Sequence, residues 1–305
     1  MIAYVSGDLF ECPAQTLVNT VNTVGVMGKG IARQFKEIYP KMFDAYQRHC
    51  ESGEFDIGSL FLWRTPNKLV LNFPTKTSWR KPSRPEYLEA GLRRFVEIYT
   101  EAGITSVAFP PLGCGNGELD FDQVVRPLME RYLSPLPIPV YIYPPREDLR
   151  SPPEHRSIEE IRAWLRTEPR VLPFAEMWID LRELFDKRNE FRTLRSDTPF
   201  VAEFDEKHEQ IRIRAAGTTR LFKKLEVQAL WQELRDHFHI TKRGLAERER
   251  DLSYLLPILC ALPYVGMVEL GDTYDKLHYS PAWALQLRPT KSPHKRVQGE
   301  LLFAD

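Results

Sequence analysis

The chain has 305 residues, 43% hydrophobic and 28% charged, values typical of a soluble globular protein with two domains. Its 42 basic and 42 acidic side chains balance, which excludes a strongly cationic protein that coats nucleic acid. The four cysteines lie far apart without a CxxC pair, so neither a disulfide framework nor a zinc site is expected. The first residues lack a basic signal region, and no stretch approaches the ~20 apolar residues of a membrane span. We therefore expect a cytoplasmic protein.

In the first half, short apolar runs alternate with amphipathic stretches, which is typical of βα units. This pattern predicts an α/β fold with a mixed, mainly parallel sheet between helices. The expected strands are residues 3–5, 16–19, 59–63, 69–73, 106–109 and 140–143. The expected helices are residues 31–38, 85–100 and 122–133, the second of which has apolar residues at helical spacing.

Prolines at 144–145 and 152–153 interrupt the chain and predict a domain boundary. We expect a first domain at 1–147 and a second domain at 155–305. The second domain is predicted to be a smaller, mostly helical α+β domain, with an order of elements that a winged-helix module and many other small domains share. The expected helices are 157–166, 173–189, 221–238 and 244–262; the expected strands are 200–204, 210–215, 265–270 and 277–279.

Two glycine-rich segments follow predicted strands of the first half. One is Gly25-Val-Met-Gly28-Lys-Gly30-Ile-Ala32, and the other is Pro110-Pro-Leu-Gly-Cys-Gly-Asn-Gly117. Glycines let backbone N–H groups approach and cradle phosphate oxygens, although a plain turn is the alternative and neither spacing matches GxGxxG or a Walker loop. In an open α/β sheet, ligands bind at the carboxyl ends of the strands. The two segments therefore predict an anion-binding cleft at that edge.

Asp8 follows the first strand in Gly7-Asp8-Leu9. Its carboxylate could accept a hydrogen bond from an exocyclic amine, or it could simply cap a turn. The order of these segments resembles the macrodomain family, which binds ADP-ribose. The resemblance implies that Asp8 and Leu9 contact adenine, and that an aromatic residue of the last strand packs near it; Tyr141 matches best, Tyr143 is a rival, and a core role is the alternative. It further implies that two loops hold the distal ribose and the diphosphate, through Asn19, Asn22, Gly28, Lys29, Gly30, Ile31, Ala32, Gly113, Cys114, Gly115, Asn116 and Gly117.

Residues 17–32, 71–80 and 111–119 resemble one branch of that family more closely, the DarG branch of DNA ADP-ribosyl glycohydrolases. Members of this branch are antitoxins to DarT-like DNA ADP-ribosyltransferases. The resemblance implies an N-glycosidic hydrolase that removes ADP-ribose from DNA bases, thymidine by analogy, without cofactor or metal. It implies that ADP-ribosylated DNA is the substrate and that the second domain binds the toxin.

Lys76 matches the catalytic lysine of this branch, and its chemistry can be argued separately. It follows the apolar run 70–73 and a Pro-Thr turn, so a desolvated amine with a lowered pKa could attack the anomeric carbon of ADP-ribose. A surface lysine paired with a carboxylate is the alternative. The related human branch has an assisting aspartate in the second loop where this chain has Gly117. Glu118 or Asp120 could come round the loop to replace it, or the reaction could proceed without a carboxylate. Asn22 with a positioned water is the second catalytic candidate.

Trp79, Arg80 and Arg84 follow Lys76 on an expected loop beside the same cleft. A tryptophan among cations suits base stacking and phosphate contact, so we expect DNA to bind here; an anchored loop with a solvated basic face is the alternative. Two other functions remain open for the whole chain. One is a reader that binds ADP-ribose without chemistry, and the other is a hydrolase of ADP-ribosyl esters on proteins or of ADP-ribose 1″-phosphate.

Overall fold

The computed structural model describes residues 1–145, 153–194, 196–215, 217–237, 239–241, 249–270 and 282–290. The chain divides into two compact units, Met1–Ile161 and Arg162–Asp305. The domain ranges expected from the prolines, 1–147 and 155–305, remain a proposal.

A six-stranded mixed sheet lies at the centre of the first unit, with the strand order β1-β6-β5-β2-β4-β3. All neighbours are parallel except β3 and β4, which are antiparallel. The expected mixed, mainly parallel sheet is therefore confirmed, although β2 and β4 run on to Asn22 and Lys76, past their expected ends at 19 and 73. The strands are β1 (Ile2–Tyr4), β2 (Thr16–Asn22), β3 (Phe61–Arg64), β4 (Leu69–Lys76), β5 (Val107–Phe109) and β6 (Val140–Ile142).

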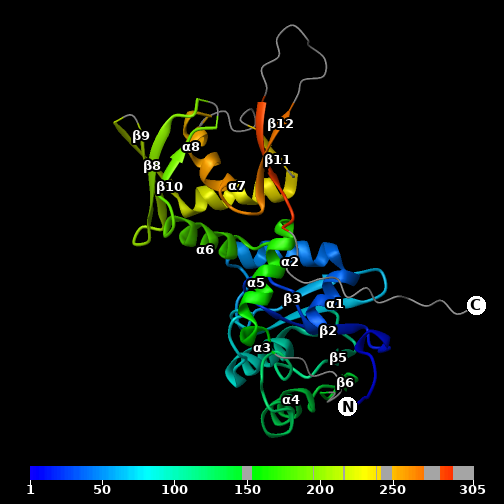
Figure 1. Cartoon of the computed structure of the whole chain (residues 1–305). Helices are drawn as coiled ribbons and strands as arrows, with labels where there is room; N and C mark the ends of the chain where they lie inside the picture. Colours follow the sequence, from blue (N-terminus) through cyan, green and yellow to red (C-terminus); the bar gives the residue numbers. More distant parts are fainter. Residues whose placement is uncertain are drawn as a thin grey trace, which may run out of the picture. The chain divides into compact units, whose positions relative to one another are not determined.

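Helices cover both faces of this sheet. α1 and α2 lie on one side, and α3 and α4 lie on the other (Figure 1). The sequence analysis missed α2, although Pro40 in its first turn and a left-handed Gly53 (φ 78°) after its last turn are typical end signals. The helical segments are η1 (Leu9–Glu11), α1 (Gly30–Ile38), α2 (Pro40–Ser52), α3 (Pro85–Ile98), the π-helical turn η2 (Phe121–Val125), α4 (Arg126–Leu133) and the 3₁₀ turn η4 (Glu154–Arg156).

Side chains that share one face of β4 and one face of α3 form the core between the sheet and this helix. Leu69, Leu71 and Phe73 alternate along β4, and they pack with Leu88, Leu92 and Phe95 of α3 in one buried cluster. α3 approaches β4 so closely at Gly91 that an added Cβ would lie 2.3 Å from the Phe73 ring. This packing fixes β4, whose last residue is Lys76.

The second unit contains two further sheets, the antiparallel β10-β9-β8-β7 and the three-stranded β11-β13-β12. Its elements are η5 (Pro169–Val171), α6 (Phe174–Phe185), β7 (Glu190–Arg192), β8 (Pro199–Asp205), β9 (Gln210–Ala215), β10 (Thr218–Lys223), α7 (Lys224–His237), β11 (His239–Thr241), α8 (Glu249–Cys260), β12 (Val265–Leu270) and β13 (Ala282–Leu287); α5 (Ile158–Thr167) includes the division between the units.

The strands predicted at 200–204 and 210–215 are present as β8 and β9, which pair antiparallel. The predicted helix 221–238 is wrong at its start, because residues up to Lys223 pair with β9 and α7 begins at Lys224. The predicted strand 277–279 lies outside the described residues, and β13 was not predicted. The winged-helix comparison remains untested. No helix within the described ranges combines the length and the apolar character that crossing a membrane requires.

Candidate functional site

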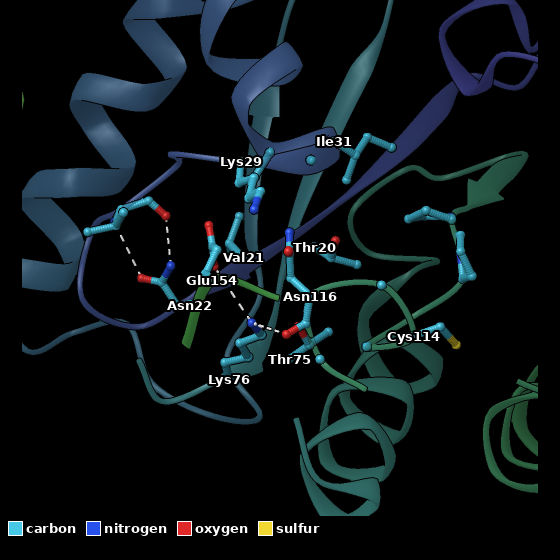
Figure 2. A pocket seen from close by; sticks show the side chains of 18 residues that line it. Thr20, Val21, Asn22, Lys29, Ile31, Thr75, Lys76, Cys114, Asn116 and Glu154 are labelled. Atoms are coloured by element: carbon cyan, nitrogen blue, oxygen red, sulfur yellow. Dashed lines mark hydrogen bonds and ion pairs between the residues drawn. The ribbon is translucent and has the colours of Figure 1, made fainter. Parts of the chain in front are cut away.

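A cavity of about 210 Å³ opens at the carboxyl ends of β2 and β4, where the sheet gives way to loops. It has one charged pair in its lining, Lys76 and Glu154, with Asn116 beside them (Figure 2). Its lining residues are Thr20, Val21, Asn22, Val26, Lys29, Gly30, Ile31, Ala32, Thr75, Lys76, Pro110, Pro111, Gly113, Cys114, Gly115, Asn116, Gly117 and Glu154. This is the edge at which open α/β sheets bind ligands.

Asn22 holds the first glycine loop in shape. Its amide Nδ2 donates to Val26 O at 2.7 Å, and its Oδ1 accepts from the backbone N–H groups of Val24 and Val26. The hydroxyl of the fully buried Tyr46 donates to Asn22 O at 2.6 Å. Asn22 therefore lines the cavity but uses its side-chain hydrogen bonds on the loop, which leaves little capacity for positioning a water molecule.

The first loop ends at the N-terminus of α1, which opens on the cavity. Gly30 is its first residue and has a φ of 60°, and Lys29 before it makes no side-chain capping bond to the helix. The first N–H groups of a helix lack partners within it, so this end of α1 suits a negatively charged ligand group. Asn116 reaches across from the second loop, since a Cβ added to Gly30 would lie 3.0 Å from Asn116 Nδ2.

The shape of the second loop requires glycine at two of the three positions that glycine occupies in it. Gly113 has a φ of 67°, and a Cβ added at Gly117 would lie 2.3 Å from Gly113 O and 2.2 Å from Ser83 Oγ. Gly117 O also accepts from Ser83 N at 3.0 Å. Gly115, in contrast, has open space where a Cβ would be. The loop thus has no room for a side chain at position 117, whereas position 115 has room for one.

Lys76 is the last residue of β4 and is only 6% exposed. Its Nζ donates to Asn116 O at 2.6 Å and lies 3.6 Å from Glu154 Oε2. Desolvation by burial lowers the pKa of Lys76, while the nearby carboxylates of Glu154 and Glu118 oppose that shift. A lysine in this setting has a larger fraction of neutral, nucleophilic amine than a surface lysine.

Glu154 belongs to the 3₁₀ turn η4 and was not predicted as a site residue. It is 6% exposed, and burial raises its pKa, opposed by Lys76 and Lys29. It lies 78 positions beyond Lys76, in a proline-rich segment without a recognisable motif. A glutamate that follows two prolines gives no signal of a catalytic site in the sequence alone.

Glu118 and Asp120, the two acids proposed from the sequence to assist Lys76, have other partners. Glu118 pairs with His155 Nε2 at 2.9 Å and with Arg156, both in η4 or at its end. Asp120 caps the turn η2, because its Oδ1 accepts from Gln123 N at 2.7 Å. Neither side chain lines the cavity. The carboxylate beside Lys76 comes from Glu154 instead.

Several residues expected to bind ADP-ribose do not line the cavity: Asp8, Leu9, Asn19, Gly28 and Tyr141. Asp8 is exposed and caps η1 by accepting from Phe10 N at 3.0 Å, which is the turn role left open above. Asn19 is fully buried and donates to Asn72 Oδ1 within the sheet. Asn19 therefore joins two strands, and its 0% exposure argues against direct ligand contact.

The rival aromatic residue, Tyr143, follows β6 directly and lies near enough to Asp8 to feel its charge. Tyr143 is buried beside Cys12, and desolvation, Cys12 and Asp8 all raise the pKa of its phenol. Tyr141 is half-buried in β6, paired with residues of β1 and β5. The geometry favours Tyr143 over Tyr141 as the aromatic residue near Asp8.

The expected DNA-contact residues have different environments. Trp79 is completely buried, so its ring has no face open to a base, and its burial argues against the stacking role. The Arg80 guanidinium lies 4.5 Å from the Trp79 ring. Arg84 is exposed and precedes α3. Of the three residues, Arg84 is best placed for contact with a phosphate backbone.

The first unit is thus an α/β domain with a mainly parallel sheet, and its cavity brings together a helix N-terminus, two glycine loops and a buried lysine, an arrangement suited to an anionic ligand. No group of three or more His, Cys, Asp or Glu residues in the described part of the chain could hold a metal ion. The Macro domain family model matches residues 18–128, which include most of the cavity lining. ADP-ribose glycohydrolase OARD1 of Bos taurus is 30% identical over 124 residues, 40% of this chain and 78% of that protein. The chain belongs to the macrodomain family.

Other relatives match more strongly but over less of their own length. The DNA ADP-ribosyl glycohydrolase of Mycobacterium tuberculosis is 48% identical over 149 residues, 48% of this chain and 42% of the relative. A DNA ADP-ribosyl transferase-DNA ADP-ribosyl glycohydrolase fusion protein of Thermosipho africanus is 40% identical over 165 residues, again 48% of this chain and 42% of the relative. A solved structure, the macrodomain of Mycobacterium tuberculosis DarG, is 48% identical, covers 48% of this chain and 99% of that chain, and gives a TM-score of 0.46. The chain thus spans less than half the length of these two relatives.

Proposed function

We propose that the chain is a hydrolase that cleaves the N-glycosidic bond between ADP-ribose and a DNA base, thymidine being the base by analogy. The observation that carries the proposal is the buried amine of Lys76, which lines the same cavity as the two glycine loops. This amine donates a hydrogen bond to Asn116 O and lies next to the buried carboxylate of Glu154. A site that only held ADP-ribose would need the loops, but it would not need a desolvated lysine. Relatives named for DNA ADP-ribosyl glycohydrolase activity each match 48% of the chain, which supports the same proposal.

In this mechanism the diphosphate lies between the two loops, near the N-terminus of α1. Backbone N–H groups can carry two phosphate charges there without a metal ion. The adenine extends toward Asp8 and Tyr143, and the distal ribose comes to Lys76. Nζ of the neutral amine then attacks the anomeric carbon and displaces the base, and water resolves the sugar–lysine adduct.

We further propose that the second unit docks a DarT-like transferase, which would make the chain the antitoxin of a toxin–antitoxin pair. Two features support this idea. The Thermosipho relative is named as a fusion of a DNA ADP-ribosyl transferase and a DNA ADP-ribosyl glycohydrolase. The stretches that match this relative and the mycobacterial one each cover 48% of this chain, which leaves about half of the chain for another role. Co-purification of the second unit with a DarT-like transferase tests the proposal, and a truncated chain without this unit serves as the control.

The activity is tested by two parallel incubations. The chain is mixed with ADP-ribosylated single-stranded DNA and, separately, with protein carrying ADP-ribosyl esters, and released ADP-ribose is followed by chromatography. We expect release from DNA. Release only from protein would support a hydrolase of ADP-ribosyl esters instead. Binding of ADP-ribose without release from either substrate would support a protein that binds ADP-ribose without chemistry.

A further inference from the structure

Cleaving a glycosidic bond requires a proton for the departing group as well as a nucleophile. The inference drawn here rests on the proposed hydrolase function and concerns the source of that proton. The second loop cannot supply it from position 117, where a Cβ would overlap Gly113 O. Glu118 and Asp120 are engaged by other partners.

Glu154 is the one carboxylate among the described residues that line the cavity. Figure 2 shows it on the side of the cavity between Lys29 and Lys76, with a dashed line to the lysine amine. Its side chain is about as buried as that of Lys76, at 7% exposure each. At a separation of 3.6 Å, two buried opposite charges interact far more strongly than the same pair on the surface.

The turn that carries Glu154 is held in place at several points. Its backbone closes on itself, since Arg156 N donates to Pro153 O at 3.0 Å and Ser157 N donates to Glu154 O at 3.0 Å. His155 and Arg156 both pair with Glu118, which follows directly after Gly117. The second glycine loop therefore anchors the turn that brings Glu154 to the cavity.

We propose that Glu154 is the proton donor of the reaction and that it shares one proton with Lys76. In the resting ion pair the proton is on Nζ; transfer to Glu154 Oε2 gives a neutral amine and a neutral carboxylic acid at once. Nζ then forms a bond to the anomeric carbon while the bond from that carbon to the base breaks, and the Glu154 proton goes to the base. Water next forms its bond to the anomeric carbon, the carbon–Nζ bond breaks, and the water's second proton returns to the Lys76–Glu154 pair.

The surroundings of the pair favour this proton transfer. Desolvation lowers the pKa of Lys76 and raises the pKa of Glu154, and both shifts bring the ammonium and the carboxylate closer in proton affinity. Two neighbouring charges oppose these shifts: Lys29, just before α1, lowers the pKa of Glu154, and Glu118, just after the second loop, raises the pKa of Lys76. Asn116 O can keep its hydrogen bond throughout, because a neutral amine still has two N–H groups.

A glutamate in this place could instead act through its negative charge, by repelling the diphosphate of the substrate. The two roles predict opposite results for Glu154→Gln, which keeps the size of the side chain and removes its proton chemistry. The experiment measures single-turnover release of ADP-ribose from ADP-ribosylated DNA, and ADP-ribose affinity by calorimetry. Glu160→Gln, an exposed glutamate on α5, is the matched control.

We expect Glu154→Gln to slow release by about 100-fold or more, the usual contribution of a positioned acid, with ADP-ribose affinity within about threefold of the wild type. The wild-type rate should peak at the pH where the pair holds one proton, and the variant should keep only the rise of rate with pH that Lys76 causes. If the variant does not fold, Glu154→Asp replaces it, and we expect at least a tenfold loss from the withdrawn carboxylate.

Three outcomes would overturn the proposal. A variant as fast as the wild type would show that Glu154 gives no proton, and a faster variant with tighter ADP-ribose binding would show that the charge of Glu154 repels the substrate. An unchanged bell-shaped pH profile in the variant would assign the second titrating group to another residue. A wild-type chain that releases nothing from DNA or protein would instead overturn the proposed function itself, so the two failures can be told apart.

Discussion

Asn22 and Lys76 are paired at the ends of two adjacent parallel strands, just after an irregularity between Val21 and Asn22. The Asn22 side chain turns to the first glycine loop, and the Lys76 side chain turns to Asn116 in the second. The backbone pairing of β2 and β4 therefore fixes the lysine relative to both loops. The lysine itself makes few of the contacts that shape them.

For this reason Lys76→Ala should separate binding from chemistry. We expect release of ADP-ribose from DNA to fall by about a thousandfold or more, because losing a nucleophile removes several kcal/mol of transition-state stabilisation. ADP-ribose affinity should stay within about tenfold, since other segments hold the phosphates. Single-turnover assays and calorimetry measure the two quantities, and Lys41→Ala, exposed on α2, is the control. Near-normal turnover would remove Lys76 from the mechanism.

Gly115→Glu tests the second loop as the phosphate site. The position has room for a side chain, so the variant should fold with a wild-type melting temperature. A carboxylate there would repel the diphosphate, and we expect ADP-ribose affinity to fall by roughly a hundredfold. Gly115→Gln has nearly the same size without the charge and should lose less. Unchanged affinity in the glutamate variant would exclude this loop from the binding site.

Gly117→Ala should act on stability, because its Cβ would overlap the backbone of Gly113. Overpacking of this kind costs roughly 1–3 kcal/mol, and backbone atoms cannot move aside as a side chain can. Urea denaturation measures the free energy of unfolding, and Gly115→Ala is the matched control, expected to be nearly neutral. Equal stability of the two variants would contradict the loop geometry described here.

The sequence was sufficient to predict the sheet and the glycine loops because local patterns determine them. Apolar runs that end in a glycine loop or in a Pro-Thr turn place Asn22, Lys76 and Gly113 at one edge, and the structure brings these three together around the cavity. Glu154 could not be predicted, since a long-range contact after a proline-rich segment brings it to Lys76. Trp79 was misjudged for a related reason: a tryptophan next to Arg80 and Lys81 suggests a basic surface, but only tertiary packing decides that its ring is buried.

The burial of Trp79 separates its role from that of Arg84. Trp79→Ala should lower the free energy of unfolding by about 3–5 kcal/mol, as for other large buried aromatics. Arg84→Gln should leave stability unchanged, because the side chain is exposed, and should weaken binding to ADP-ribosylated single-stranded DNA more than to free ADP-ribose. Thermal melts and titrations at two salt concentrations measure both effects. Equal losses for DNA and free ADP-ribose would argue against DNA contact at Arg84.

The last prediction concerns the length of chain that catalysis needs. A catalytic domain ending at residue 147 contains the whole sheet, both glycine loops and Lys76, but it lacks Glu154. The first compact unit extends to Ile161 and includes it. We therefore expect a chain of residues 1–161 to release ADP-ribose from DNA at nearly the full rate. A chain of residues 1–147 should bind ADP-ribose with similar affinity and release it about a hundredfold more slowly, as expected from the loss of a positioned acid.

Calorimetry with ADP-ribose establishes first that both truncated chains are folded, so that a lost rate reports chemistry. Glu154→Gln within residues 1–161 is the matched control, and its rate should fall to that of residues 1–147, because both lack the same carboxylate. Equal, near-complete activity of the two truncations would mean that the macrodomain core needs no acid from η4. A folded but inactive 1–161 chain would instead show that the second unit contributes to catalysis, and would argue against a docking role as its sole function.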